Sequence, residues 1–134
     1  MVMLFSLDSM CDKMKNYSMQ ELAFIGDAVH TKFVREQIIK NNTLKLNEIH
    51  KTSSKFCSAK WQSKIYEKIK DMLDFEESEI MRMARNSKPK HTAKNADPAD
   101  YHKATAFEAL VGWLYLNNKI ERLDVILNLS INEE

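Results

Sequence analysis

The sequence predicts an all-α domain. Apolar residues recur at spacings of three and four along most of the chain, and no segment alternates apolar and polar residues as a half-buried strand does. Glycine and proline are scarce, with two of each in 134 residues, so the chain has few residues that break helices. Hydrophobic residues make up 44% and charged residues 29%, which is typical of a globular protein. We expect one domain over residues 1–134, in which residues 1–15 form an N-terminal extension.

The first predicted helix begins at Ser18 and runs to about Lys40. Ser18 and Glu21 have the spacing of a capping box, in which each side chain bonds the backbone N–H of the other residue. Two asparagines after Lys40 end the helix. A short helix from Asn47 to about Ser54 follows. Another is expected from Lys55 to about Met72, directly or after a bend.

The second half of the chain is expected to contain three helices and one exposed loop. A helix over about 74–86 begins with an aspartate and a glutamate three residues later, which form a second capping box. A helix over about 97–116 begins with an aspartate followed by a proline, the residue best suited to the first helical position. A last helix covers about 120–129. Residues 86–96 are polar, basic and interrupted by proline, so they are expected to form an exposed loop.

Both glycines of the chain lie inside predicted helices, and each lies near an acid. Gly26 precedes Asp27, and Gly112 follows Glu108 by one helical turn. A glycine inside a helix is less stable than an alanine by about 1 kcal/mol. This cost predicts that the missing side chains let two helices approach closely. The neighbouring acids are therefore candidates for a functional site.

The apolar residues around Asp27 and Glu108 predict that both carboxylates lie in apolar surroundings, which requires a compensating partner. Helical spacing places Ala23 beside Asp27, and Thr105 beside Glu108. Two carboxylates within ~4 Å would repel by about 4 kcal/mol at an effective dielectric constant of 20. A shared Mg²⁺ turns this repulsion into attraction.

Two other arrangements explain the same acids without a metal. Asp27 could pair with a basic residue of its own helix, Lys32 or Arg35, and Glu108 could simply cap or bridge helices. The pattern of residues leaves these alternatives open.

Charge is segregated along the chain, although the net charge is only +1. The segment from Lys45 to Lys70 has seven lysines against two glutamates, a local charge of +5. The segment from Arg82 to Lys103 has six basic residues against two aspartates, a local charge of +4. Such segments are typical either of solvated helix faces or of surfaces that bind a polyanion.

The sequence also indicates a compartment. No apolar run approaches the ~20 residues of a membrane span, and the N-terminus lacks the basic start of an export signal. Cys11 and Cys57 have neither zinc-type nor redox-type spacing, so we interpret both as free thiols. We expect a cytoplasmic protein with no membrane contact.

Two segments resemble the signature strings of the ribonuclease III catalytic domain. They are Glu21-Leu22-Ala23-Phe24-Ile25-Gly26-Asp27-Ala28-Val29 and the run 104–116, Ala-Thr-Ala-Phe-Glu-Ala-Leu-Val-Gly-Trp-Leu-Tyr-Leu. Arg85-Asn86-Ser87-Lys88 and Lys94-Asn95-Ala96-Asp97 are similar to the Mini-ribonuclease III branch, which lacks a double-stranded-RNA-binding domain. The resemblance covers nearly the whole chain.

The resemblance implies a helical endoribonuclease domain that works as a homodimer and cuts double-stranded RNA laid across a basic valley. It implies that Asp27 and Glu108 are both the catalytic acids and the Mg²⁺ ligands. It also implies trimming of precursor 23S ribosomal RNA, with a large-subunit ribosomal protein as a possible partner. The chain departs from the usual family pattern of four acids, because Ala23 and Thr105 occupy two of those positions.

The predicted RNA contacts are basic and amide side chains. They lie at Arg85, in the loop over residues 86–96 that follows it, and along the first basic segment. They are Arg85, Asn86, Lys88, Lys90, Lys94, Asn95, Lys51, Lys55 and Lys60. Two rival functions remain: a catalytically silent module that binds structured RNA or the ribosome, and a helical metal-binding bundle without a nucleic-acid partner.

Overall fold

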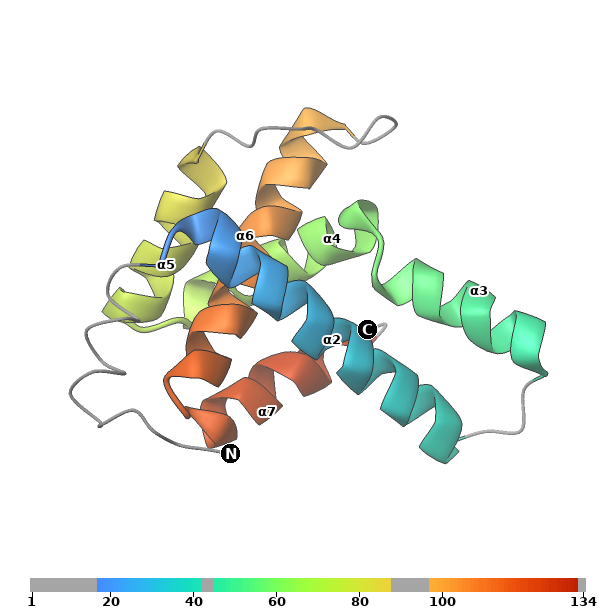
Figure 1. Ribbon diagram of the computed structural model, residues 1–134. Coiled ribbons are helices and arrows are strands. Elements are labelled where there is room, and N and C mark those ends of the chain that lie inside the picture. The colour runs from blue at the N-terminus through green and yellow to red at the C-terminus, as the bar shows by residue number, and fades with distance from the viewer. Residues whose placement is uncertain (1–16, 42–44, 88–96, 133–134) are drawn as a thin grey trace.

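Figure 1 presents the computed structural model of the protein, which describes residues 17–41, 45–87 and 97–132. All regular structure in these ranges is helical, which confirms the predicted all-α class. The elements in chain order are α2 (Met19–Asn41), α3 (Leu46–Phe56), α4 (Ala59–Ile69), the 3₁₀ turn η1 (Lys70–Met72), α5 (Phe75–Asn86), α6 (Pro98–Leu116) and α7 (Ile120–Ser130).

Helix α6 is the centre of the bundle. It contacts α2, α4, α5 and α7, and its contact with α2 is the most extensive in the described structure. Figure 1 shows α2 crossing α6, while α3 extends away from the other helices. The side chains of Phe107, Leu110 and Leu114 are fully buried. A helix that is apolar on several sides is expected to have neighbours on several sides, and α6 confirms this.

Three of the predicted helix starts are confirmed in detail. The Ser18 hydroxyl accepts the backbone N–H of Glu21 at 3.1 Å, and the Glu21 carboxylate accepts that of Ser18 at 2.9 Å. Asp74 and Glu77 form the second capping box. Asp97 caps α6. Local capping chemistry therefore fixes where three of these helices begin.

One predicted boundary is wrong. The helix expected to begin at Lys55 begins at Ala59, and α3 continues to Phe56. The Ser58 side chain caps α4 by accepting the backbone N–H of Trp61 at 3.2 Å. The bend at residues 57–58 separates α3 from α4. The last residues of the predicted helix form η1.

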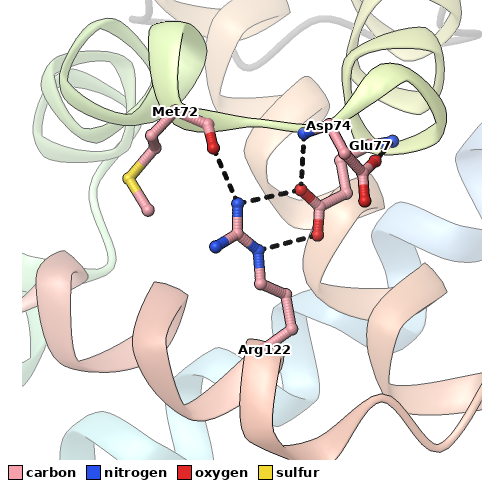
Figure 2. A network of polar contacts seen from close by, with 4 residues as sticks. All are labelled: Met72, Asp74, Glu77 and Arg122. Atoms are coloured by element: carbon pink, nitrogen blue, oxygen red, sulfur yellow. Dashed lines mark hydrogen bonds and ion pairs between the residues drawn. The ribbon is translucent and has the colours of Figure 1, made fainter.

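The start of α5 is tied to α7 by an ion pair between the buried Glu77 and the partly exposed Arg122 (Figure 2). Glu77 is only 2% exposed. Its two carboxylate oxygens accept hydrogen bonds from Arg122 at 2.8 and 2.9 Å, and the same guanidinium donates to the carbonyl of Met72 at 2.8 Å. Such bidentate pairing of a guanidinium with a carboxylate is among the stronger polar contacts in proteins. It joins η1, α5 and α7 in one place.

In the part of the chain that the structure describes, no helix combines the length and the apolar character needed to cross a lipid bilayer.

Candidate active site

Helices α2 and α6 touch through backbone at the two glycines. A Cβ atom placed on Gly26 would overlap the backbone carbonyl of Glu108, and one placed on Gly112 would overlap the carbonyl of Leu22. No side chain larger than hydrogen fits at either position. The prediction that the glycines permit a close helix approach is confirmed. The same contact sets the backbone of Glu108 against that of Gly26, next to Asp27.

Asp27 and Glu108 consequently form a carboxyl pair. Both side chains line one cleft, and the two carboxyl groups are close enough to hydrogen bond when Glu108 is protonated. The pKa of Glu108 is raised from 4.5 to about 9, first by burial and then by the hydrogen bond and the charge of Asp27. A hydrogen bond from Gln62 acts in the opposite direction. Without a cation, this pair holds a proton at neutral pH.

The expectation that both acids lie in apolar surroundings is only half correct. Glu108 is half-buried, whereas Asp27 is exposed at the surface of the single chain. Asp27 lines the cleft described below and reaches water directly. Lys32, one of the alternative partners considered for Asp27, pairs with Glu36 at 3.0 Å instead.

The carboxyl pair opens into a cleft of about 370 Å³. The cleft lies between α2, α6 and the bend that joins α3 to α4. Ala23 and Thr105, at the two positions where the family usually has acids, both line it. The Thr105 hydroxyl donates to the carbonyl of Tyr101 at 2.9 Å, so its oxygen remains an acceptor toward the cleft.

The donor chemistry of the pair fits a hydrated divalent cation. Mg²⁺ prefers one or two protein carboxylates and completes its octahedron with water or phosphate oxygens. Two neighbouring carboxyl groups that share one proton release it when a cation binds to both of them. Among the described residues, no group of three or more His, Cys, Asp or Glu side chains is placed to hold a metal. A cation here would have Asp27 and Glu108 as its acidic ligands.

Two lysines predicted to bind RNA are neighbours, along the chain, of residues that line the cleft. Cys57 and Ala59, at the bend between α3 and α4, line the cleft, and the exposed lysines Lys55 and Lys60 flank these residues. The ammonium group of Lys55 lies 5.4 Å from the ring centre of Trp61. Such cation–π contacts help to hold a lysine ammonium group in place. Lys51 is exposed one turn earlier on α3.

The other predicted contacts are divided between α5 and the segment that follows. Arg85 and Asn86 are exposed at the end of α5, where the Arg85 guanidinium lies 5.8 Å from the ring centre of Tyr66. The Ser87 hydroxyl accepts a hydrogen bond from Gln20, a residue that lines the cleft, at 2.9 Å. The end of α5 is thus tied to the rim. Four predicted contacts lie outside the described residues: Lys88, Lys90, Lys94 and Asn95.

An apolar surface adjoins the cleft. Phe24 is 80% exposed and contributes both to the cleft and to a second hollow of about 370 Å³. Tyr17, Ile25 and Leu116 also line this hollow. Nearby on α6, Tyr115 is 46% exposed, whereas Trp113 is half-buried beneath Lys119. Large exposed aromatic groups beside a site are typical of a protein interface.

Comparison with known proteins decides the family. Residues 20–119 match the Ribonuclease III domain family. The chain belongs to the ribonuclease III family. Relatives named Mini-ribonuclease 3 include one from Thermoanaerobacter sp., 43% identical over 82% of this chain and 78% of its own length. Another, from Clostridium tetani, is 44% identical over 83% of this chain and 74% of its own length.

A solved structure extends this likeness to the fold. The crystal structure of a Fusobacterium nucleatum protein superposes with a TM-score of 0.80 at 34% identity, covering 89% of this chain and 95% of that one. As a ribonuclease III family member, the chain is an endoribonuclease. The family acts on double-stranded RNA as a dimer with a divalent metal. The all-α ribonuclease III-type fold predicted from the two signature strings is confirmed.

Sequence reasoning missed Gln62, His30 and Ser130. These side chains are buried, come from α4, α2 and α7, and lie in one hydrogen-bonded series that reaches Glu108. Helical periodicity carries no signal for such a series, because its members are far apart in the chain. The signals present in the sequence were a glutamine and a histidine on helix faces that are otherwise apolar.

Proposed function

We propose that the chain is a Mg²⁺-dependent endoribonuclease that cuts double-stranded RNA as a homodimer, with Asp27 and Glu108 as catalytic acids and metal ligands. The observation that carries this proposal is the carboxyl pair held across the contact between Gly26 and Gly112, open to a cleft beside basic side chains. Like-charged acids forced together by backbone contact are characteristic of sites that bind a cation.

Each residue has a defined task in this mechanism. When bound, Mg²⁺ supplies charge neutralisation at the phosphate and activation of water. Asp27, exposed at the cleft, and Glu108, half-buried, would hold the cation through their carboxylate oxygens. The Thr105 hydroxyl orients water through its free lone pairs. Lys55 and Lys60 beside the cleft bind phosphates and hold the duplex against the pair.

The first experiment is cleavage of a labelled perfect RNA duplex and of the matching single strand, with Mg²⁺ or with a chelator. We expect the duplex alone to be cut, only with Mg²⁺, and activity to be lost in Asp27→Asn and Glu108→Gln. Asp124→Asn removes an exposed carboxylate on α7 and should cut like the parent. Full activity of Glu108→Gln would disprove the assignment. Binding without cutting by the parent would favour the silent RNA-binding module.

Duplex binding should depend on the lysines near the bend. A-form RNA is recognised largely through its shape and its phosphate and 2′-hydroxyl groups, so sequence preference should be modest. Each lost phosphate contact should lower the slope of log affinity against log salt by about 0.9 for a duplex. We expect this flattening for Lys51→Gln, Lys55→Gln and Lys60→Gln. Lys68→Gln, which only loses a bond to the carbonyl of Asn132, should keep the parent slope.

The homodimer would bury Phe24 and the apolar hollow beside it. Phe24→Asp should then sediment as a monomer, whereas Phe75→Asp, which alters an equally exposed aromatic residue at the start of α5, should remain a dimer. A parent protein that sediments as a monomer at micromolar concentration would contradict this part of the proposal.

The resemblance to the Mini-ribonuclease III branch supports precursor 23S ribosomal RNA as the natural substrate, presented by a large-subunit ribosomal protein in the cytoplasm. Mapping the ends of 23S ribosomal RNA in cells that lack this chain tests the substrate. Mature ends in such cells would argue against it.

A further inference from the structure

A buried hydrogen-bonded series crosses the core behind the carboxyl pair. His30 and Ser130 are completely buried, and Gln62 is 2% exposed. Nε2 of His30 lies 3.0 Å from Oγ of Ser130, and Nδ1 lies 3.2 Å from Nε2 of Gln62. In the described part of the chain, no buried side-chain polar atom lacks a partner. Burying polar groups is tolerated only when they are paired in this way.

The donor and acceptor of each hydrogen bond in the series can be assigned by starting from Ser130, at the end farthest from Glu108. The Ser130 hydroxyl lies 2.6 Å from the carbonyl of Leu127, which can only accept, so the hydroxyl proton is used there. Ser130 must therefore accept from Nε2–H of His30. Because a neutral imidazole has one N–H, Nδ1 is left as an acceptor. Gln62 must then present its NH₂ group to His30, not its carbonyl oxygen.

This order leaves one N–H of Gln62 for the carboxyl pair. The Gln62 side chain lines the same cleft as Glu108, and hydrogen bonding by Gln62 acts to lower the pKa of Glu108. A single NH₂ group can donate to both His30 and Glu108, since it carries two hydrogens. With the amide reversed, its oxygen would face the lone pair of Nδ1 of His30, and neither of these two atoms would have a donor.

The imidazole is also held in place by packing. Its ring meets that of Phe107, the neighbour of Glu108 on α6, edge to face, with centroids 5.0 Å apart and planes at 84°. Burial lowers the pKa of His30 to about 4, so the ring is neutral at physiological pH and keeps Nδ1 as an acceptor. The end of α7, where Ser130 lies, is further tied to α4 because Trp61 donates to the Ser130 carbonyl at 2.6 Å.

We propose that Gln62 is a positioning residue for Glu108, and that His30 and Ser130 fix the orientation of the Gln62 amide. This inference rests on the proposed role of Glu108 as a metal ligand. Groups that hydrogen bond to a ligating carboxylate orient it and favour its charged form, and losing one typically lowers metal affinity or activity by 10- to 100-fold. Gln62 is suited to this because its amide is almost fully buried and is held by His30 at the wall of the cleft that Glu108 also lines.

The test measures metal affinity directly, with Mn²⁺ as a paramagnetic substitute for Mg²⁺ titrated by electron paramagnetic resonance. Gln62→Met keeps the length of the side chain and removes the donor. His30→Leu keeps Gln62 but removes the acceptor that orients it. We expect at least about 10-fold weaker Mn²⁺ binding for Gln62→Met and a smaller loss for His30→Leu. Ser63→Ala, a buried neighbour on α4 that does not line the cleft, is the matched control.

The double variant separates positioning from general loosening of the core. If His30 acts through Gln62, adding His30→Leu to Gln62→Met should weaken Mn²⁺ binding no further. Unchanged affinity in Gln62→Met, or losses that multiply in the double variant, would overturn the inference. So would a parent protein whose Mn²⁺ binding is absent or is indifferent to Glu108→Gln. A parent that binds Mn²⁺ but does not cut duplex RNA would refute the proposed activity while leaving the positioning role supported.

Discussion

Replacing Glu108 by glutamine should stabilise the metal-free protein, although the residue is assigned to catalysis. In the folded chain its pKa is about 9, whereas the ordinary value is 4.5. At neutral pH the folded carboxyl is therefore protonated and the unfolded one is ionised. The folded state binds more protons, so stability falls as pH rises from about 4.5 towards 9. Glutamine is neutral in both states and avoids this loss.

The size of the effect follows from the distance between pH 7 and the ordinary pKa. Protonating an ordinary carboxyl at pH 7 costs about 1.4 kcal/mol for each of roughly 2.5 pH units. Glu108→Gln should therefore raise the free energy of unfolding by up to about 3 kcal/mol at pH 7 and by only about 1 kcal/mol at pH 5.

Urea unfolding followed by circular dichroism, with a chelator and at one protein concentration, measures this difference. Asp124→Asn removes one exposed negative charge and should stay within about 0.5 kcal/mol of the parent. Adding Mg²⁺ should then stabilise the parent but not Glu108→Gln. A variant that is no more stable than the parent at both pH values would refute the reasoning, because it would mean that folding does not force the two carboxyl groups together.

Substitutions at three features of the structure test the fold. Gly26→Ala and Gly112→Ala each place a Cβ in the backbone of the opposite helix, so each should lower the free energy of unfolding, measured by urea unfolding, by at least the 1 to 3 kcal/mol typical of overpacking. Arg122→Met leaves the buried Glu77 unpaired and should lower the free energy of unfolding by about 3 to 5 kcal/mol, and adding Glu77→Gln should recover much of this loss. Asn118 has a positive φ of 57°, so Asn118→Val should destabilise the turn before α7 by about 1 to 3 kcal/mol in the same assay, whereas Asn118→Gly should not.

The sequence predicted those features that depend on neighbouring residues. The capping boxes at Ser18 and Asp74 are formed by residues three apart, so their chemistry is visible in the chain itself. Gly26 and Gly112 were informative because a glycine inside a helix is destabilising without a packing reason.

The features that sequence reasoning missed depend on contacts between distant segments. The Arg122 partner of Glu77 and the His30 partner of Gln62 come from other helices, and no spacing rule relates them. The exposure of Asp27 was misjudged for a similar reason. Apolar neighbours along α2 indicate a buried helix, but only the arrangement of α6 and α4 determines which side of α2 faces the cleft.

The contact between Gly26 and Gly112 also has a kinetic consequence. It joins helices from opposite halves of the chain, so the carboxyl pair does not exist until α2 and α6 have docked. A cation bound by the pair would stabilise the docked state alone, and its binding energy would then lengthen the lifetime of the folded chain. Depletion of that cation would expose the protein to proteases as well as stop it from cutting RNA.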